Sequence, residues 1–269
     1  MRLPRLIATD LDGTLLDPYG RVTPRSVAAI RAAHEAGIVV VFASGRPPFV
    51  ASTEIAATAG CVGYGVMANG SFICTLPDAA PLRVIEFRAA LAFDAVRRLR
   101  DADPRFGFAL ASDRAFTHEA GFTERMPVQH AGAPPVADVL VGHDDAELAV
   151  KLIVFHHDLG ADELLHRIPP IVGASLEATH MGADAVELGP PGADKGTGLA
   201  WLCAHLGIDA DDVLVYGDEI NDLAMMQFAG RGVAVANATP LVLAAADEVC
   251  GSHADDGVAA HLETVLTAG

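Results

Sequence analysis

Basic residues are scarce in this chain of 269 residues, in which 18 lysines and arginines face 35 aspartates and glutamates, for a formal net charge of −17. A protein this acidic repels the phosphate backbone of nucleic acids and the anionic surface of membranes, so we expect neither as a partner. A small anionic substrate is not excluded, because a bound metal ion or one local cation can reverse the field within a single pocket.

Cysteines are also few. The four that are present form no CxxC pair, and none stands at zinc-site spacing from a histidine, so we interpret them as small buried residues of a reduced protein. No apolar run approaches the ~18 residues that a membrane span needs. The first residues, MRLPRLIATD, lack the apolar centre of a signal peptide. These absences predict a cytoplasmic protein.

Aromatic residues make up only 6% of the chain, whereas hydrophobic residues as a whole reach 51%. Alanine, valine, leucine and isoleucine must therefore supply the core, as is typical of α/β proteins. In the first part of the chain, strand-like apolar runs at 6–9, 38–46 and 64–71 alternate with helix-like segments at 23–37 and 47–60. This β-α-β-α-β order predicts a parallel sheet with right-handed crossovers.

The pattern changes in the middle of the chain, where residues 83–185 contain strand-like and helix-like segments without that alternation. We interpret this region as an inserted α+β domain with an antiparallel sheet. From Lys195 onward, helices and strands alternate again. The sequence thus predicts a doubly wound, Rossmann-like α/β core built from residues 1–82 and 186–269, with residues 83–185 as a second domain between them.

Polar residues stand where several predicted core strands end. Two aspartates follow the first strand, a serine follows the second, two aspartates follow the strand at 213–216, and a lysine begins the helix after the insertion: Asp10, Asp12, Ser44, Asp218, Asp222 and Lys195. Ligands of doubly wound sheets bind outside the carboxyl ends of the strands. We therefore expect these side chains to face one crevice.

The four aspartates together indicate a metal site. Asp10 and Asp12 are two residues apart, so on an extended chain they lie side by side, unless one of them offers its backbone carbonyl instead. Four carboxylates in a low-dielectric crevice cannot all stay ionised without a cation. Because the ligands are hard oxygens, with no histidine or cysteine among them, the set predicts Mg²⁺ rather than zinc.

Phosphoryl transfer from a phosphate monoester would use every group in this set. One carboxylate can attack phosphorus and form an aspartyl-phosphate, and a second carboxyl can serve first as acid and then as base. Lys195 and Mg²⁺ can neutralise the phosphoryl oxygens. The Ser44 hydroxyl and the backbone amides near Gly45 and Gly13 can donate hydrogen bonds to them.

These motifs, in this order, resemble those of the haloacid dehalogenase superfamily. DLDGTLL (10–16) is similar to the first motif, ASGR (43–46) to the second, ADKGTGL (193–199) to the third and GDEINDLAMM (217–226) to the fourth. The resemblance implies that Asp10 is the nucleophile and Asp12 the acid/base. It implies that the phosphate-binding residues are Ser44, Gly45, Lys195 and Asn221. The implied metal ligands are Asp10, Asp12 (through its backbone carbonyl), Asp218 and Asp222.

The insertion between Ser44 and Lys195 resembles the C2 cap of this superfamily. Its α+β character, the segment MANGS (67–71) and the tail DDGVAAHLE (255–263) are similar to the type IIB, or Cof-like, sugar-phosphate phosphatases. The resemblance implies a Mg²⁺-dependent phosphatase of a small phosphorylated metabolite. Its cap would close over the site, exclude water and recognise the leaving group.

Several assignments have two interpretations. Arg46 either contacts substrate or bridges to a core acid, and Asn69 and Gly70 lie either beside the substrate or in a simple turn. Near the ends of the inserted strands, three histidines either contact the leaving group or have surface or core roles: His156, His157 and His180. A phosphotransferase such as a hexose phosphomutase and a catalytically silent binding protein are the alternative functions. The substrate and the oligomeric state stay open.

Overall fold

The computed structural model describes residues 2–47, 51–58, 60–112, 116–122, 136–140, 147–180 and 184–268. Two compact units make up the chain. The core unit comprises Met1–Val84 and Asp194–Gly269, and the inserted unit comprises Ile85–Ala193. Each unit has its own sheet and its own helices, so each is described separately.

The core unit is built on an eight-stranded sheet in the order β15-β14-β13-β1-β2-β3-β4-β5. The six strands from β15 to β3 are parallel, and β4 and β5 add an antiparallel edge. The strands are β1 (Leu6–Thr9), β2 (Val39–Ala43), β3 (Tyr64–Met67), β4 (Phe72–Thr75), β5 (Pro81–Val84), β13 (Val213–Gly217), β14 (Arg231–Val235) and β15 (Glu248–Cys250). Because β1 pairs with both β2 and β13, the two ends of the sequence form one sheet, as predicted.

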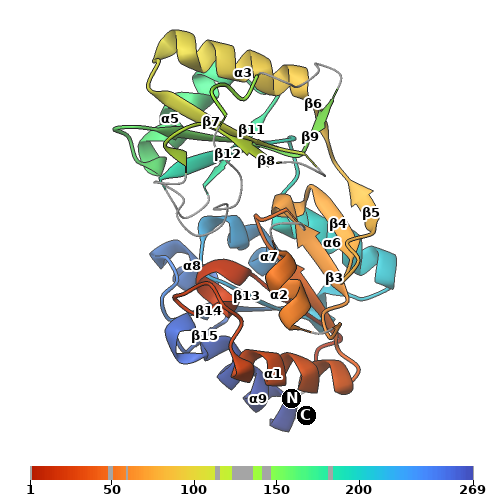
Figure 1. Cartoon of the computed structure of the whole chain (residues 1–269). Coiled ribbons are helices and arrows are strands. Elements are labelled where there is room, and N and C mark those ends of the chain that lie inside the picture. The colour runs from red at the N-terminus through yellow and green to blue at the C-terminus, as the bar shows by residue number, and fades with distance from the viewer. Residues whose placement is uncertain are drawn as a thin grey trace. The chain divides into compact units, whose positions relative to one another are not determined.

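Helices of the core unit precede or follow these strands along the chain. They are α1 (Pro24–Glu35), α2 (Ser52–Ala57), α6 (Lys195–Leu206), α7 (Leu223–Phe228), α8 (Pro240–Ala245) and α9 (Gly257–Ala268). The predicted start of α1 is confirmed, since the Thr23 side chain accepts a hydrogen bond from the backbone N–H of Ser26. Helices α1 and α9 lie side by side, and α6 packs against α7 (Figure 1). A predominantly parallel α/β core is therefore confirmed.

The inserted unit has a five-stranded antiparallel sheet in the order β11-β12-β10-β7-β8. Its strands are β7 (Phe106–Ala111), β8 (Phe116–His118), β10 (Lys151–His156), β11 (Glu177–His180) and β12 (Ala185–Gly189), and β6 (Phe87–Arg88) pairs with β9 (Leu148–Ala149). Helices α3 (Ala89–Ala102) and α5 (Ala161–Val172) pack against each other and against the sheet. The α+β character of the insertion is thus confirmed.

Helix α5 contains two prolines near its carboxyl end. Proline lacks the backbone N–H and clashes with the preceding turn, so it would ordinarily end the helix at Pro169. Instead the helix continues to Val172 through Pro169 and Pro170, and the N–H of Gly173 donates to the Pro169 carbonyl at 2.9 Å. Ile168 and Val172 both belong to the apolar core of the inserted unit. Burial of these side chains therefore outweighs the local cost of the prolines.

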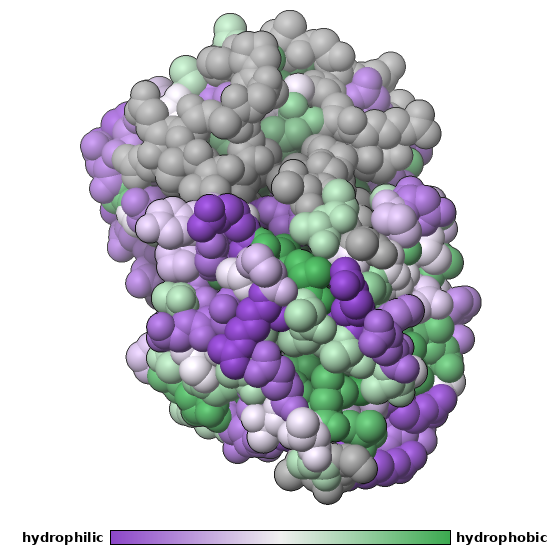
Figure 2. Space-filling model, turned by 60° about the horizontal axis from the view of Figure 1, so that its bottom comes forward, coloured by the Kyte–Doolittle hydropathy of each residue, from purple (hydrophilic) through white to green (hydrophobic). Residues whose placement is uncertain are grey.

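The surface of the molecule mixes hydrophilic and hydrophobic areas, as one face shows in Figure 2. The large hydrophobic side chains that are exposed are scattered over both units: Tyr19, Leu91, Leu148, Ile220, Leu241 and Val249. Scattered exposure of this kind is ordinary for a folded protein. Among the described residues, no helix has the length and apolar character to cross a membrane.

Candidate active site

Strands β1 and β13 bring two of the predicted aspartates together. The strands are parallel neighbours with Thr9 opposite Tyr216, and the N–H of Asp10 continues the ladder by donating to the Tyr216 carbonyl at 3.0 Å. Asp10 and Asp218 therefore leave the sheet at the same edge. All four residues of β1 are buried, so the strand holds Asp10 rigidly at that edge.

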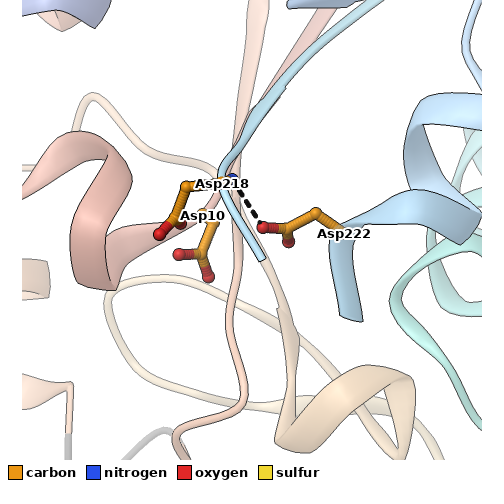
Figure 3. Close-up of side chains that lie close together, drawn as sticks. All are labelled: Asp10, Asp218 and Asp222. Atoms are coloured by element: carbon orange, nitrogen blue, oxygen red, sulfur yellow. Dashed lines mark hydrogen bonds between the residues drawn. The ribbon is translucent and has the colours of Figure 1, made fainter. Parts of the chain in front are cut away.

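A third aspartate is fixed by the backbone of the turn after β13. Asp222 lies in the short 3₁₀ turn Ile220–Asp222, and its Oδ2 accepts hydrogen bonds from the N–H groups of Asp218 at 2.9 Å and Glu219 at 3.1 Å. Figure 3 shows the first of these bonds and the close approach of the three side chains. One carboxylate oxygen each from Asp10, Asp218 and Asp222 lies within 4.8 Å of the others.

Lys195 neutralises part of this charge. It is the first residue of α6, its side chain is 1% exposed, and its Nζ donates to Oδ1 of Asp10 and to Oδ1 of Asp222, both at 2.6 Å. Burial alone would lower the pKa of Lys195, but the two carboxylates raise it above its ordinary value. Lys195 is therefore a buried ammonium ion shared by two aspartates.

One ammonium does not balance three buried carboxylates. Burial raises the pKa of Asp10 well above its usual range, with Lys195 opposing this shift and Asp222 adding to it. Burial, helped by Asp222, raises the pKa of Asp218 to about 7. The excess negative charge and the all-oxygen donor set fit a divalent cation such as Mg²⁺. Asp10, Asp218 and Asp222 would be its carboxylate ligands.

Asp12 does not join the three buried carboxylates. Its side chain is 42% exposed, and both of its oxygens accept hydrogen bonds from the Arg46 guanidinium. The chain turns immediately after it, because Gly13 adopts a φ of 78°. We expected all four carboxylates to share one crevice, and the structure separates them into a buried trio and one partly exposed acid. Two aspartates only two residues apart thus have different surroundings.

Gly13 is required by the approach of Asp218. A Cβ on Gly13 would lie 2.3 Å from Asp218 Oδ2. We expect Gly13→Ala to displace this carboxylate. The Mg²⁺ concentration needed to raise the melting temperature should then increase by at least about tenfold. The left-handed backbone alone should lower the free energy of unfolding by about 1–2 kcal/mol.

Gly37→Ala is the matched control for this prediction, since Gly37 has a φ of 80° and no atom within 4 Å of its would-be Cβ. It should show the backbone cost without the loss of the Mg²⁺ response. Urea unfolding and Mg²⁺ titrations of the melting temperature measure both quantities. An unchanged Mg²⁺ response in Gly13→Ala would contradict the assignment of Asp218.

The predicted phosphate-binding residues lie on neighbouring turns. Ser44 is buried directly after β2, and its Oγ accepts a hydrogen bond from the N–H of Arg46 at 3.1 Å. The N–H of Asn69 donates to the Ser44 carbonyl at 3.1 Å, and Asn221 Nδ2 donates to Asn69 Oδ1 at 3.1 Å. Ser44 is followed by the half-buried Gly45. Contacts from Ser44 through Asn69 to Asn221 therefore link three of these turns.

Gly70 has a packing role in the short 3₁₀ turn Ala68–Gly70 after β3. A Cβ there would lie 2.1 Å from the carbonyl oxygen of Asp194, the residue that caps α6 immediately before Lys195. Gly70 thus lets the backbone of one turn pack directly on the start of the lysine-bearing helix. The two interpretations of Asn69 and Gly70, substrate neighbour and turn, are compatible in this geometry.

Sequence reasoning missed two polar residues of this network. Thr14 Oγ1 donates to Asp218 Oδ1 at 2.6 Å, and Asn237 Nδ2 donates to the Gly13 carbonyl at 2.8 Å. Thr14 lies within the quoted motif DLDGTLL, and Asn237 follows strand β14 closely. The rule that selected the aspartates, polar residues near the carboxyl ends of parallel strands, applies equally to Asn237.

The inserted histidines have different surroundings. His156 is fully buried, its Nδ1 accepts from the N–H of Asp158 at 3.1 Å, and its Nε2 lies 3.3 Å from Asp103 Oδ2. His157 is exposed, with its ring against Phe155. The side chain of His180 lies outside the described residues. His156 therefore has the contacts of a core residue, the second of its two interpretations.

A family model for haloacid dehalogenase-like hydrolases matches residues 7–262, nearly the whole chain. The chain belongs to this family. Named phosphatases are similar to this chain over nearly its whole length. The pyridoxal phosphate phosphatase YbhA of Escherichia coli (strain K12) is 28% identical over 276 residues, covering 95% of this chain and 96% of that protein. The 5-amino-6-(5-phospho-D-ribitylamino)uracil phosphatase YcsE of Bacillus subtilis (strain 168) is 26% identical, covering 95% and 93%.

A solved structure shares the fold of both units. A subclass IIB sugar phosphatase of the haloacid dehalogenase superfamily superposes with a TM-score of 0.83 at 18% sequence identity, covering 97% of this chain and 98% of that one. The inserted α+β unit is thus consistent with a type IIB cap. The resemblance to the Cof-like, type IIB branch of the haloacid dehalogenase superfamily is confirmed.

Proposed function

We propose that this protein is a Mg²⁺-dependent phosphatase that hydrolyses a small phosphorylated metabolite through an aspartyl-phosphate. One observation carries the proposal: a buried lysine joins two carboxylates of an acidic trio at the carboxyl edge of a parallel sheet. This arrangement combines a nucleophile, a fixed cation and the ligands of a metal ion. Phosphoryl transfer requires these three things, because its catalysis is mostly positioning and charge neutralisation.

Each residue has a role in two half-reactions. Asp10 attacks phosphorus through the oxygen that Lys195 does not hold, so that a bond to phosphorus forms as the bond to the leaving oxygen breaks. Asp12 gives its proton to the leaving oxygen. Asp12 then takes a proton from water as that water attacks phosphorus, which releases phosphate and restores the Asp10 carboxylate.

The remaining groups bind the phosphoryl oxygens. We assign this role to the Ser44 hydroxyl, the Gly45 amide and Asn221, with Lys195 supplying a fixed positive charge. When bound, Mg²⁺ would be held by Asp10, Asp218 and Asp222 with the Asp12 carbonyl, and it would neutralise negative charge on the phosphoryl group. The preformed hydrogen bonds of Lys195 and Asp222 mean that little reorganisation is needed when substrate binds.

The substrate class follows from the relatives and from the charge of the chain. Two of the relatives are named for pyridoxal phosphate and for a phosphorylated ribitylaminouracil, which are small molecules with one phosphomonoester. A net charge of −17 disfavours larger polyanions. We therefore propose a small phosphomonoester as the substrate of this protein.

A panel of phosphomonoesters, assayed with and without Mg²⁺ for phosphate release, tests the proposal. We expect kcat/KM to differ among the esters and to be highest for the preferred substrate class. Phosphate release should stop in EDTA. Formation of an isomer of a sugar phosphate in place of free phosphate would indicate the phosphotransferase alternative. No release from any ester in the presence of Mg²⁺ would overturn the proposal and favour a binding protein.

The stability of the protein should respond to Mg²⁺ in a pH-dependent way. Because the pKa of Asp218 is raised to about 7, this group favours the folded state when protonated, and that contribution is lost as pH rises from the unfolded pKa of about 4 through about 7. Mg²⁺ requires the ionised form. In EDTA we therefore expect the melting temperature to fall across this window, and in Mg²⁺ we expect the fall to be reversed.

Thermal unfolding in EDTA and in Mg²⁺ between about pH 5 and pH 8 measures this difference. Apparent Mg²⁺ affinity should rise by about tenfold per pH unit below pH 7 through Asp218, because Mg²⁺ displaces the proton of this carboxyl group. Asp218→Asn removes the titrating group, so the fall of the melting temperature with pH in EDTA should disappear in this variant. A Mg²⁺ effect that is independent of pH in the wild type would contradict the prediction.

A further inference from the structure

Arg46 makes a two-point contact with Asp12. Its Nε donates to Asp12 Oδ2 at 2.7 Å, and its Nη2 donates to Asp12 Oδ1. This fork geometry is the most directional contact that an arginine makes with a carboxylate. Each carboxylate oxygen has two lone pairs, so Arg46 occupies one on each oxygen and leaves the other available for a proton.

Both the guanidinium and the backbone of Arg46 are held by hydrogen bonds. Its side chain is 6% exposed, and its Nη1 donates to Oε1 of Glu54, a buried residue of α2, at 2.9 Å. Its backbone N–H donates to Ser44 Oγ at 3.1 Å, and its carbonyl accepts from the N–H of Ala68 at 3.0 Å. The guanidinium therefore has little freedom to move, and neither does the carboxylate that it grips.

The two cations of the site divide the carboxylates between them. Lys195 pairs with Asp10 and Asp222, whereas Arg46 pairs with Asp12 and Glu54. A buried ion pair contributes little net stability, because desolvation offsets the attraction. The Asp12 side chain is 42% exposed, so without Arg46 it would sample several rotamers. The main effect of Arg46 is therefore to fix the orientation of the Asp12 carboxylate.

We propose that Arg46, held by Glu54, is a positioning residue that orients the Asp12 carboxyl for proton transfer. This inference rests on the proposed phosphatase function. Arg46 then acts through Asp12, and its loss is felt in the steps that need the proton of Asp12. Attack on phosphorus by Asp10 does not depend on it directly.

The dependence of rate on the leaving group tests this role. Nitrophenolate leaves without a proton, whereas an alkoxide requires one, so kcat/KM for 4-nitrophenyl phosphate is insensitive to the acid and kcat/KM for glycerol 2-phosphate is not. We expect Arg46→Met to lower kcat/KM about 100-fold for glycerol 2-phosphate and less than about fivefold for 4-nitrophenyl phosphate. Glu54→Gln should show the same pattern with about a tenfold loss.

Two further variants sharpen the experiment. Adding Arg46→Met to Asp12→Asn should cause no further loss on glycerol 2-phosphate, because the two residues act as a unit. Arg231→Met is the matched control: Arg231 also grips a carboxylate, that of Glu248, through Nε and Nη2, but on strands β14 and β15. It should leave the ratio of the two rates unchanged.

The outcomes separate this inference from the function on which it rests. Equal losses on the two esters in Arg46→Met and Glu54→Gln, with an active wild type, would overturn the positioning role and leave the phosphatase intact. If Arg46→Met fails to fold, Glu54→Gln decides the question, because it keeps Arg46 and a hydrogen-bond acceptor. A wild type that hydrolyses no ester of the panel would overturn both.

Discussion

Replacing Asp10 with asparagine should lower kcat by roughly 10⁴-fold or more, the size of loss seen when a member of a covalent catalytic unit is removed. The amide cannot form the acyl-phosphate bond, and Asp222 and Asp218 are held elsewhere by their own hydrogen bonds. Folding should be unimpaired. Because burial raises the pKa of Asp10 well above its usual range, a neutral side chain removes an unfavourable charge, and the melting temperature in EDTA should be no lower than that of the wild type.

Asp17→Asn is the matched control for Asp10→Asn. Asp17 directly follows the motif DLDGTLL (10–16) but pairs with Arg21 near the surface, so its replacement should retain full activity. Phosphate release and thermal unfolding measured side by side would decide the prediction. Turnover by Asp10→Asn within tenfold of the wild type would exclude Asp10 as the nucleophile.

Replacing Lys195 with methionine should affect both stability and activity. The change leaves Asp10 and Asp222 buried without their shared cation, and breaking a buried ion pair in this way costs about 3–5 kcal/mol. It also removes the fixed positive charge of the site, for which we expect a loss in kcat of roughly 10³-fold. Urea unfolding and steady-state kinetics measure the two effects. Added Mg²⁺ should restore part of the stability, because it supplies positive charge to the same carboxylates.

Lys151→Met offers a comparison within the inserted unit. Lys151 on β10 is also buried, and it pairs with the buried Glu187 on β12. Its replacement should destabilise the protein by a similar mechanism while leaving the Mg²⁺ response of the core unit unchanged. A Lys195→Met variant as stable as the wild type would show that the lysine does not carry the charge balance inferred for it.

The position of the acidic trio could be predicted because it depends on topology more than on detail. Asp10 and Asp218 are far apart in sequence, yet each follows a buried strand, and parallel strands end at one edge of the sheet. The alternation of strands and helices predicted the parallel core, and the loss of that alternation in residues 83–185 predicted the antiparallel insertion. It did not predict β15, whose three residues Glu248–Cys250 are too short to give a periodic signal.

The partner of Asp12 could not be predicted in the same way. Its spacing from Asp10 left two arrangements open, with the two side chains side by side or with one residue offering its backbone carbonyl. The direction of the side chain depends on the turn at Gly13 and on an arginine 34 residues away. The sequence alone therefore allowed two interpretations of Arg46. Helix α5 shows a second reason why sequence patterns fail. Proline ordinarily ends a helix, but burial of Ile168 and Val172 outweighs that local effect here.

Lys151 and Lys195 are the only lysines in the sequence, and both are buried in ion pairs. The folded protein therefore presents arginine, and no lysine ε-amine, as its surface cation. Amine-directed reagents such as succinimidyl esters should label the native chain only at its amino terminus, and enzymes that acetylate or conjugate lysine should find no acceptor until the protein unfolds. Labelling of a lysine would then report the loss of native structure, and at Lys195 it would report the opening of the buried site in which this lysine pairs with Asp10 and Asp222.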